Sequence, residues 1–151
     1  MLQPPKKLLF ALEAVVDIAY HAGSNPVQSR EITERQGIPQ RYLEQVMQRL
    51  VRAQILKGTR GPRGGYRLAR ERRRISVGEI ARVVTALDNH ENLTSDDAGS
   101  PLGRASVRPM WQELQSDLMT RLDGISIEDL CRRAHEKGIA TDAGRRLDFN
   151  I

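Results

Sequence analysis

The sequence predicts a mainly α-helical protein with one small β-hairpin and one long helix that stands apart from the main core. Apolar residues recur every three or four positions in several separate segments, which is the period of a helix with one buried face. Residues 55–69 differ, because short apolar segments there flank a loop rich in glycine and arginine, a pattern typical of a hairpin. A last apolar stripe follows a polar segment. Together these features predict a winged helix-turn-helix followed by a long dimerisation helix.

The composition is that of one domain with an appended helix, at 151 residues and a net charge of +5. Only 4% of the residues are aromatic and 39% are hydrophobic, a lean supply for a monomeric core that favours a homodimer. Cys131 is the single cysteine, so no intramolecular disulfide can form, and we expect a cytoplasmic location. No apolar run approaches the roughly 18 residues of a membrane span, and no signal peptide is recognised, so we expect no membrane association.

The first helix is expected after an N-terminal arm, residues 1–5, and before Gly23. Lys6 and Lys7 at its start are either solvated or in contact with phosphate, and the sequence leaves both readings open. His21, just before the glycine, is expected to be a cap or solvated rather than a ligand. The predicted buried stripe of this helix is Leu8, Leu12, Val15, Val16 and Ala19.

Two further helices are predicted between residues 29 and 53. Ser29 is a plausible N-cap of a short helix that carries Ile32 on its apolar side and ends at Gly37. Pro39 then suits the first position of the next helix, where its missing N–H costs nothing. The apolar face of that helix is Tyr42, Leu43, Val46, Met47, Leu50 and Val51. The opposite face is Arg41, Glu44, Gln45, Gln48, Arg49 and Arg52.

The hairpin is expected to place residues 55–57 against residues 66–69, with residues 58–65 as its tip. Four glycines in that tip would let the backbone reverse with positive φ and approach a duplex closely. Arg60, Arg63 and Arg67 supply charge that phosphates or a narrow minor groove would attract. The alternative is a plain solvated hairpin.

Positive charge is concentrated in one part of the chain. Residues 41–74 hold 11 basic and two acidic side chains, whereas the rest of the sequence holds 13 basic and 17 acidic ones. Such a cluster is the electrostatic signature of a nucleic-acid-binding face. Residues 70–74, which follow the hairpin, could be solvated or could contact phosphates.

The N-terminal residues of the second helix in a helix-turn-helix meet base edges. Arginine can read guanine and glutamine can read adenine through paired hydrogen bonds. Tyr42 could be partly core, and Glu44 could accept from cytosine or repel phosphates in wrong registers. The predicted DNA-binding residues are Gln40, Arg41, Tyr42, Glu44, Gln45, Arg49, Arg60, Arg63, Gly64, Gly65 and Arg67.

A further helix is predicted after the hairpin, where Ser76 and Glu79 form a capping box. Its apolar residues are Ile80, Val83, Val84 and Leu87. Residues 88–105 are polar and acidic and predict a loop. His90, Asp96 and Asp97 within it could hold a hard metal ion, but a solvated loop is the expected outcome.

The long stripe falls within residues 106–123 and could be core packing or a dimer interface, of which we favour the interface. Its residues are Val107, Met110, Trp111, Leu114, Leu118 and Leu122. Gly124 should end this helix, and Ser126 should cap one more. We expect Cys131 to be a half-buried packing residue rather than a reactive thiol.

Three motifs carry a family resemblance: RYLEQ at residues 41–45, GPRGGYRLA at 61–69 and ISVGEI at 75–80. In this order and spacing they closely resemble the Rrf-two family of bacterial winged helix-turn-helix transcription regulators, over about residues 8–130. The resemblance implies a dimer that binds palindromic promoter DNA, and we expect a repressor. It divides the chain into a DNA-binding domain (1–87), a loop (88–105), a dimerisation helix (106–123) and a C-terminal helix and tail (124–151).

The resemblance also bears on cofactors, because some relatives hold an iron–sulfur cluster with three cysteines in the loop. The matching positions here are near Leu93, at Gly99 or Ser100, and at Ala105, and a fourth-ligand position matches Arg108. None of these is cysteine, so we expect no cluster and no other cofactor.

Two functions remain open at the level of sequence. The first is a DNA-binding regulator that acts by itself, and the alternative is a regulatory module controlled by a protein partner, such as a metabolic enzyme, or by a small-molecule effector. The residues offer no nucleophile–base pair, metal-ligating constellation or phosphate-binding glycine loop at a helix start, so an enzyme is not expected.

Overall fold

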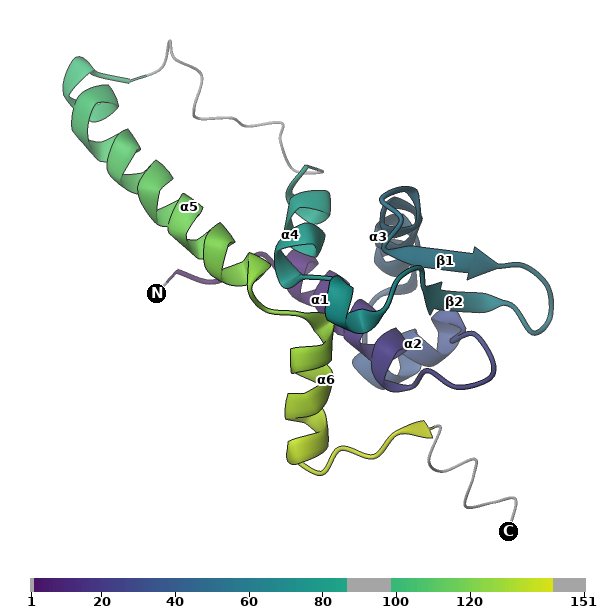
Figure 1. The fold of residues 1–151 in the computed structure, drawn as a ribbon. Helices are drawn as coiled ribbons and strands as arrows, with labels where there is room; N and C mark the ends of the chain where they lie inside the picture. Colours follow the sequence, from purple (N-terminus) through teal and green to yellow (C-terminus); the bar gives the residue numbers. More distant parts are fainter. Residues whose placement is uncertain (1, 87–98, 143–151) are drawn as a thin grey trace.

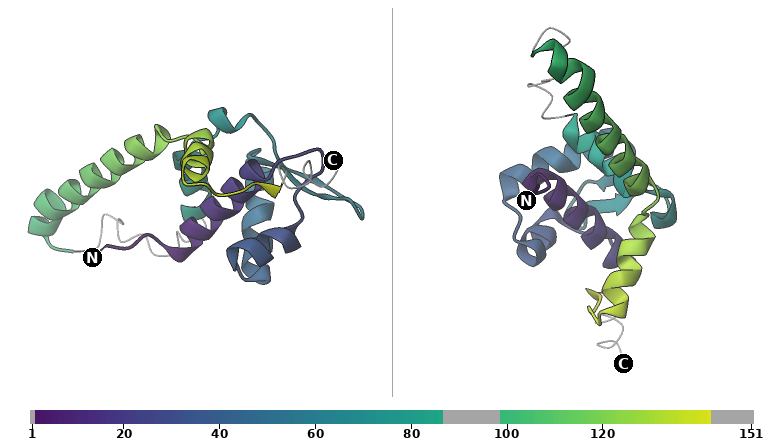
Figure 2. Two further views of the ribbon diagram at one scale, coloured as in Figure 1. Left: turned by 90° about the horizontal axis from the view of Figure 1, so that it is seen from below. Right: turned by 90° about the vertical axis from the view of Figure 1, so that its left-hand side faces the viewer.

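The computed structural model describes residues 2–86 and 99–142. Figure 1 shows a helical body from which a hairpin and one long helix project in different directions, and Figure 2 shows the same arrangement from two further sides. The elements in chain order are α1 (Lys6–Tyr20), α2 (Ser29–Gln36), α3 (Gln40–Arg52), β1 (Leu56–Thr59), β2 (Gly65–Leu68), η1 (Arg72–Arg74), α4 (Val77–Thr85), η2 (Gly103–Val107), α5 (Arg108–Asp123) and α6 (Ile127–Glu136). The mainly helical fold with a hairpin wing is as predicted.

Helix α1 lies at the centre of the body and contacts α2, α3, α4, α6 and β2. Its buried face centres on Ala11, Ala14 and Ile18, which the predicted stripe omitted, while Leu8 and Leu12 are only half-buried at its margin. The prediction favoured large apolar residues, whereas a central helix packed on several sides needs small ones where its neighbours approach closely.

Helix α2 begins one residue away from the predicted cap. Gln28 is the N-cap, and its side chain and that of Glu31 complete a capping box, so Ser29 is the first helical residue. The backbone at Gln28 is extended because the preceding residue, Val27, forms a β-bridge with Tyr66 of the wing. The helix therefore begins only at Ser29. Similarly, Pro39 is the N-cap of α3 and not its first residue. Gly37 ends α2 in the left-handed conformation, as predicted.

The wing is an antiparallel hairpin in which Leu56 lies opposite Leu68 and Thr59 opposite Gly65. Val27 adds a third, one-residue strand, because its N–H donates to the Tyr66 carbonyl at 3.0 Å and the Tyr66 N–H donates back at 2.7 Å. The wing is thereby fastened to the segment that enters α2, and a turn of residues 53–55 joins α3 to β1.

Helices α4 and α6 begin in the same way, each with a serine capping box. Ser76 pairs with Glu79 as predicted, and Ser126 caps α6 with Asp129 at the corresponding place. Helix α6 packs on α1, and Ile127 and Cys131 belong to the same core as α1–α4. Cys131 is only 2% exposed, which is deeper than the half-buried position predicted. Burial raises the pKa of its thiol, so a reactive thiolate is disfavoured.

The segment before α5 is more helical than expected. Residues 101–102 are already helical and lead through the π-helical turn η2 into α5, so the loop predicted over residues 88–105 ends at about residue 100. A helix can start here because the Ser100 hydroxyl accepts the Gly103 N–H at 3.1 Å. The predictions for Leu87, His90, Leu93, Asp96 and Asp97 fall outside the described residues.

The chain after α6 folds back onto α1 up to residue 142, within the segment that we predicted as a C-terminal helix and tail. The Tyr20 hydroxyl donates to the Ile139 carbonyl, and Asp142 pairs with Arg35 at 2.6 Å. Arg35 also holds Asp17, a carboxylate of α1 that is only 2% exposed, at 2.8 Å. Residues 139–142 are therefore tied to α1 and α2 by buried or half-buried polar contacts. Among the described helices, none has both the length and the apolarity required to cross a membrane.

Candidate nucleic-acid interface

Helix α3 presents a polar face to solvent because its apolar face is anchored in the core. Leu43, Val46, Met47 and Leu50 are buried, whereas Arg41, Glu44, Gln45, Gln48, Arg49 and Arg52 are exposed. The separation of the two faces predicted from the helical period is confirmed. A helix held in this way offers a rigid row of arginine and glutamine side chains.

The first turn of α3 is ordered by contacts between side chains. The Thr33 hydroxyl of α2 lies 3.0 Å from the Gln40 side-chain oxygen, and the Gln40 amide donates to Glu44 at 3.1 Å. Arg41 and Gln45 are exposed beside them. Tyr42 is half-buried and its ring packs on Phe10 at 5.7 Å between ring centroids, so its aromatic body serves the core.

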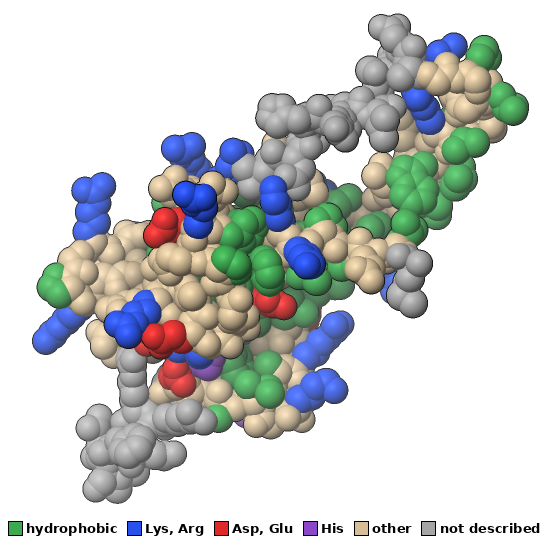
Figure 3. All heavy atoms as spheres, turned by 180° about the vertical axis from the view of Figure 1, so that it is seen from behind, with side chains coloured by type: hydrophobic (Ala, Val, Ile, Leu, Met, Phe, Trp, Pro, Cys, Tyr) green, Lys and Arg blue, Asp and Glu red, His purple; other side chains and the backbone are tan. Residues whose placement is uncertain are grey.

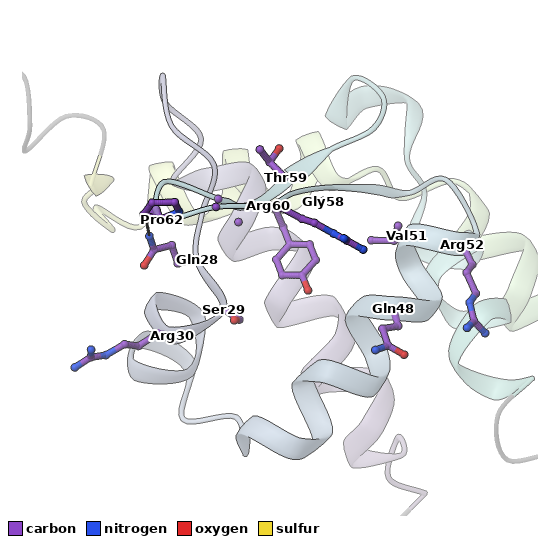
Figure 4. A pocket seen from close by; sticks show the side chains of 14 residues that line it. Gln28, Ser29, Arg30, Gln48, Val51, Arg52, Gly58, Thr59, Arg60 and Pro62 are labelled. Atoms are coloured by element: carbon purple, nitrogen blue, oxygen red, sulfur yellow. Dashed lines mark hydrogen bonds between the residues drawn. The ribbon is translucent and has the colours of Figure 1, made fainter.

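A hollow of about 790 Å³ separates the second half of α3 from the wing and the start of α2. Figure 4 shows Gln48, Val51 and Arg52 on its α3 side and Thr59, Arg60 and Pro62 on its wing side. The Arg60 side chain extends from the wing towards Val51. On the far wall, the Gln28 amide donates to the Pro62 carbonyl at 3.3 Å, which joins the wing tip to the N-terminus of α2 (Figure 4).

Gly64 and Gly65, both predicted to allow close approach to DNA, have close neighbours inside the protein. A Cβ atom at Gly65 would lie 2.4 Å from the Val27 carbonyl oxygen, and its φ of 153° also favours glycine. A Cβ at Gly64 would lie 2.3 Å from the Thr59 carbonyl oxygen. Gly61 has the positive φ that we expected of the tip, but nothing lies within 4 Å of its Cβ position.

Arg67 points away from the wing tip, towards the loop between α1 and α2. Its guanidinium donates to the carbonyl oxygens of Gly23 and Ser24, the first at 3.3 Å. This arginine therefore supports the fold of the wing base. The alternating pattern of the strand gave no signal for this role, since the acceptors are backbone atoms more than 40 residues earlier in the chain.

Most basic residues at positions 70–74 are paired with glutamates, although Arg74 forms no ion pair with a described residue. In the segment after the wing, Arg70 pairs with Glu79 at 3.2 Å, Arg73 pairs with Glu71 at 2.5 Å, and Arg72 pairs with Glu128. By contrast, six basic residues on α3 and the wing form no ion pair with another described residue. We call this group the basic face: Arg41, Arg49, Arg52, Lys57, Arg60 and Arg63.

A second hollow, of about 390 Å³, extends the basic face towards the start of α1. It is lined by Lys7 of α1 and by Gln45, Arg49 and Arg52 of α3. Lys7, which the sequence left as either solvated or in contact with phosphate, therefore lies beside the exposed arginines of α3. Gln48 and Arg52 line both hollows, so one exposed surface runs from the wing across α3 to α1.

The residues at the positions of the cluster ligands do not fit an iron–sulfur cluster. The Ser100 hydroxyl is engaged at the start of a helix, and Ala105 lies in η2 without a donor atom. Cys131 is buried on α6, which follows the body end of α5, whereas Ser100 and Ala105 precede its projecting end (Figure 1). In residues 2–86 and 99–142, no three histidine, cysteine or acidic side chains gather into a metal-binding group. One thiolate cannot hold a cluster that needs several converging ligands.

Comparison with known proteins agrees with this architecture. The family model Rrf2, described as an iron-dependent transcriptional regulator, matches residues 5–133. The HTH-type transcriptional regulator IscR of Aliivibrio salmonicida is 38% identical over 124 residues, which cover 80% of this chain and 72% of that protein.

Two solved structures resemble the fold over most of its length. T. potens IscR has a TM-score of 0.72 at 34% identity and covers 93% of each chain. CymR, the global cysteine regulator of B. subtilis, has a TM-score of 0.68 at 26% identity and covers 88% of this chain and 98% of its own. The family match spans most of the sequence, and the winged helix-turn-helix lies inside it. The chain therefore belongs to the Rrf2 family of DNA-binding transcription regulators.

Proposed function

We propose that this protein is a homodimeric, sequence-specific repressor that binds palindromic promoter sites in the bacterial cytoplasm. The observation that carries the proposal is the distribution of basic side chains. Six basic side chains of α3 and the wing lack an ion pair with a described residue, whereas Arg70, Arg72 and Arg73 of the following segment are paired. A duplex offers a regular row of phosphates that an exposed group of this kind can neutralise.

In the proposed complex, the first half of α3 enters the major groove. Arg41 and Gln45 are exposed there and can form bidentate contacts to guanine and adenine, each worth about 1–3 kcal/mol of discrimination. Gln40 and Glu44 are already linked, so they would act as a pair. Arg49 and Arg52 face the phosphates, and Arg60 and Arg63 let the wing reach the adjacent groove.

The proposal that the protein is a dimer rests on α5. None of the residues of this helix is buried within one chain. Figure 3 shows hydrophobic side chains gathered along one face of the projecting helix. Leu114 and Leu118 are 52% and 57% exposed, and exposed apolar stripes of this length mark interaction sites. A second copy of α5 would cover the stripe, which comprises Val107, Met110, Trp111, Leu114, Leu118 and Leu122.

These surfaces suggest a separate role for each segment of the chain. Residues 1–87 carry the DNA-binding face and residues 106–123 carry dimerisation. Residues 124–151 begin with α6, which shares its core with the DNA-binding body and so supports it. The proposal includes no catalytic role.

The first experiment is selection of DNA sites from a random duplex library, followed by fluorescence anisotropy on the enriched sequence. We expect an inverted repeat and a steep loss of affinity with salt. The six residues of the basic face give twelve cations per dimer, so the slope of log K against log salt should be no steeper than about −11. Failure to enrich any sequence would contradict specific recognition. Transcription in vitro from a promoter that contains the site should decrease, and an increase would replace repression by activation.

A second candidate is control through a protein partner or a small-molecule effector. It is favoured by the absence of thiolates at Gly99, Ser100 and Ala105, where cluster-binding relatives would receive their signal. The test is to add the protein fraction and the small-molecule fraction of a cell extract separately to the purified regulator. A fraction that changes the Kd for the selected DNA identifies the class of signal, and no effect of either fraction would argue against this candidate.

A further inference from the structure

Helix α5 is joined to the body at its base. Its principal contacts with the body are with α4, and none of its residues is buried in the chain (Figure 1). The direction of α5 is therefore fixed at the junction of residues 75–78 with residues 123–127, which we call the elbow. Any feature that sets the geometry of the elbow also sets the direction of the whole helix.

Backbone hydrogen bonds join the two segments of the elbow. The Val77 N–H donates to the Ile125 carbonyl at 2.8 Å, and the Ile127 N–H donates to the Ile75 carbonyl at 2.9 Å. Ile75 and Ile127 are both fully buried. Since the serine caps of α4 and α6 form the β-bridge between these two bonds, the elbow is a rigid pair of helix starts.

Gly78 lies where the end of α5 meets α4. A Cβ atom there would lie 1.9 Å from the Asp123 Oδ1 atom and 3.0 Å from the Asp123 backbone nitrogen. The residue is the second of α4 and has no positive φ, so its conformation does not require glycine. The structural reason for glycine at this position is therefore the space that it leaves for Asp123.

Asp123 uses that space to form an ion pair with α4. Its two carboxylate oxygens accept from the Arg82 guanidinium at 2.7 Å each. This bidentate pair fixes orientation as well as distance. A side chain at residue 78 would displace the carboxylate and press on the backbone of Asp123, so α5 would leave the body in a different direction.

The length of α5 magnifies a change at its base. A helix of 16 residues is about 24 Å long, so a tilt of about 10° moves its far end by about 4 Å. That displacement is comparable to the rise of one base pair, about 3.4 Å. In a dimer joined through α5, the same tilt would change the separation of the two α3 helices.

We propose that Gly78 is a positioning residue that sets the spacing between half-sites. By seating Asp123 against α4, it fixes the direction of α5 and hence the distance between the two recognition helices. Half-site spacing in helix-turn-helix dimers follows from this distance. The inference rests on the proposed DNA-binding dimer, and it adds which residue determines the number of base pairs between the half-sites.

The test uses the full-length chain and the selected inverted repeat, with its centre shortened or lengthened by one and two base pairs. Gly78→Ala should remain folded and dimeric but lose about tenfold or more in affinity for the wild-type spacing. Its preferred spacing should shift or become flat, while its affinity for a single half-site changes less than about twofold. Gly124→Ala is the matched control, because a Cβ there meets its nearest neighbour at an ordinary 3.5 Å.

Asp123→Ala removes the ion pair without adding a side chain, so it carries the test if Gly78→Ala does not fold. It should broaden the spacing preference. If the wild-type protein discriminates between spacings and both variants keep the same profile, the inference is overturned. If the wild-type protein has no spacing preference, the result contradicts the proposed binding of palindromic sites by a dimer and not the role of Gly78.

Discussion

At the scale of single residues, the neighbours of each arginine decide whether its charge is available to a ligand. Arg72 and Arg73 lie in the most basic run of the sequence, yet both are paired with glutamates. Arg60 and Arg63, on the wing, form no ion pair with another described residue. Sequence locates the cluster of charge, but only the positions of the acidic side chains show which of its arginines are already paired.

Arg63→Ala should weaken binding to the selected DNA by about tenfold or more, because a charge-assisted contact is lost from each wing. If the contact is to phosphate, the salt slope should decrease by about 0.9 for each contact, or about two per dimer. The measurement is anisotropy at several salt concentrations. Arg73→Ala is the matched control and should leave both quantities nearly unchanged. Equal losses for the two variants would remove the distinction between free and paired arginines.

Gly65→Ala should destabilise the fold by about 2–4 kcal/mol, because it combines an unfavourable φ with a clash against the Val27 carbonyl oxygen. Gly61→Ala has the positive φ but open space around the Cβ position, so it should cost only about 1 kcal/mol. Urea denaturation of both variants measures the difference. Equal costs would mean that the bridge between Val27 and the wing contributes little.

His21 should make the stability depend on pH. Burial lowers the pKa of its imidazole below the ordinary 6.5, and the effect of burial exceeds the opposing attraction of Asp17 and Asp142. The neutral ring also accepts the Asp142 N–H at Nδ1, at 3.0 Å. A group with a lowered histidine pKa favours the folded state above pH 6.5, so this contribution is lost as the pH falls through the folded-state pKa.

The free energy of unfolding should therefore decrease between about pH 7.5 and pH 5.5. His21→Asn keeps an acceptor for the Asp142 N–H but does not titrate, so it should show a shallower decrease over this range. Urea denaturation at each pH provides the measurement. The same pH dependence in the variant and the wild type would assign the effect to other groups.

At the scale of elements, local signals predicted most helix boundaries, and contacts distant in sequence shifted the others. The capping boxes at Ser76 and Ser126 need only residues three positions apart, which a sequence shows directly. Ser29 was expected as a cap on residue type alone, but its third following residue is Ile32, whereas Gln28 has Glu31 at that spacing and is held extended beside the bridge from Val27 to the wing.

The apolar stripe of α5 should matter for assembly and not for the stability of one chain. Replacing Leu114 and Leu118 by glutamate places four charges in the proposed dimer interface, so multi-angle light scattering should report monomers. Affinity for the inverted repeat should decrease steeply, because one half-site is then bound without the other. Circular dichroism should remain that of a folded helical protein, since both side chains are exposed in the chain.

The matched control introduces the same charges on the opposite face of α5, as Gln112→Glu with Ser116→Glu. This variant should remain dimeric and bind DNA as the wild type does, apart from a modest effect of net charge. A Leu114 and Leu118 variant that stays dimeric would place the interface elsewhere.

At the scale of the whole molecule, the motifs predicted the family, and the periodicity predicted which helix faces are buried. Neither predicted how α6 and the start of α1 lie against the rest of the protein. The family assignment made from residues 41–45, 61–69 and 75–80 is confirmed by a match over residues 5–133. The packing of α6 against α1 had no such signal, because its core residues Ile127 and Cys131 follow α5, which has no buried residue. The position of Lys7 beside Arg49 likewise depends on the angle between α1 and α3, which no spacing in the sequence encodes.

The last prediction is that the whole chain binds no iron–sulfur cluster. Anaerobic reconstitution with iron and sulfide should yield no stoichiometric cluster, as judged by iron analysis and by the absence of charge-transfer bands in the visible spectrum. Cluster iron needs several thiolate or imidazole ligands that converge from fixed positions, and the sequence contains one cysteine. That cysteine is buried with a raised pKa, so it is also a poor site for adventitious iron.

Cys131→Ala is the control that separates adventitious binding from a built site. Trace iron that disappears in this variant would come from the single thiol, whereas a stoichiometric cluster in both proteins would reveal ligands outside the described residues and overturn the prediction. DNA affinity should be the same before and after reconstitution.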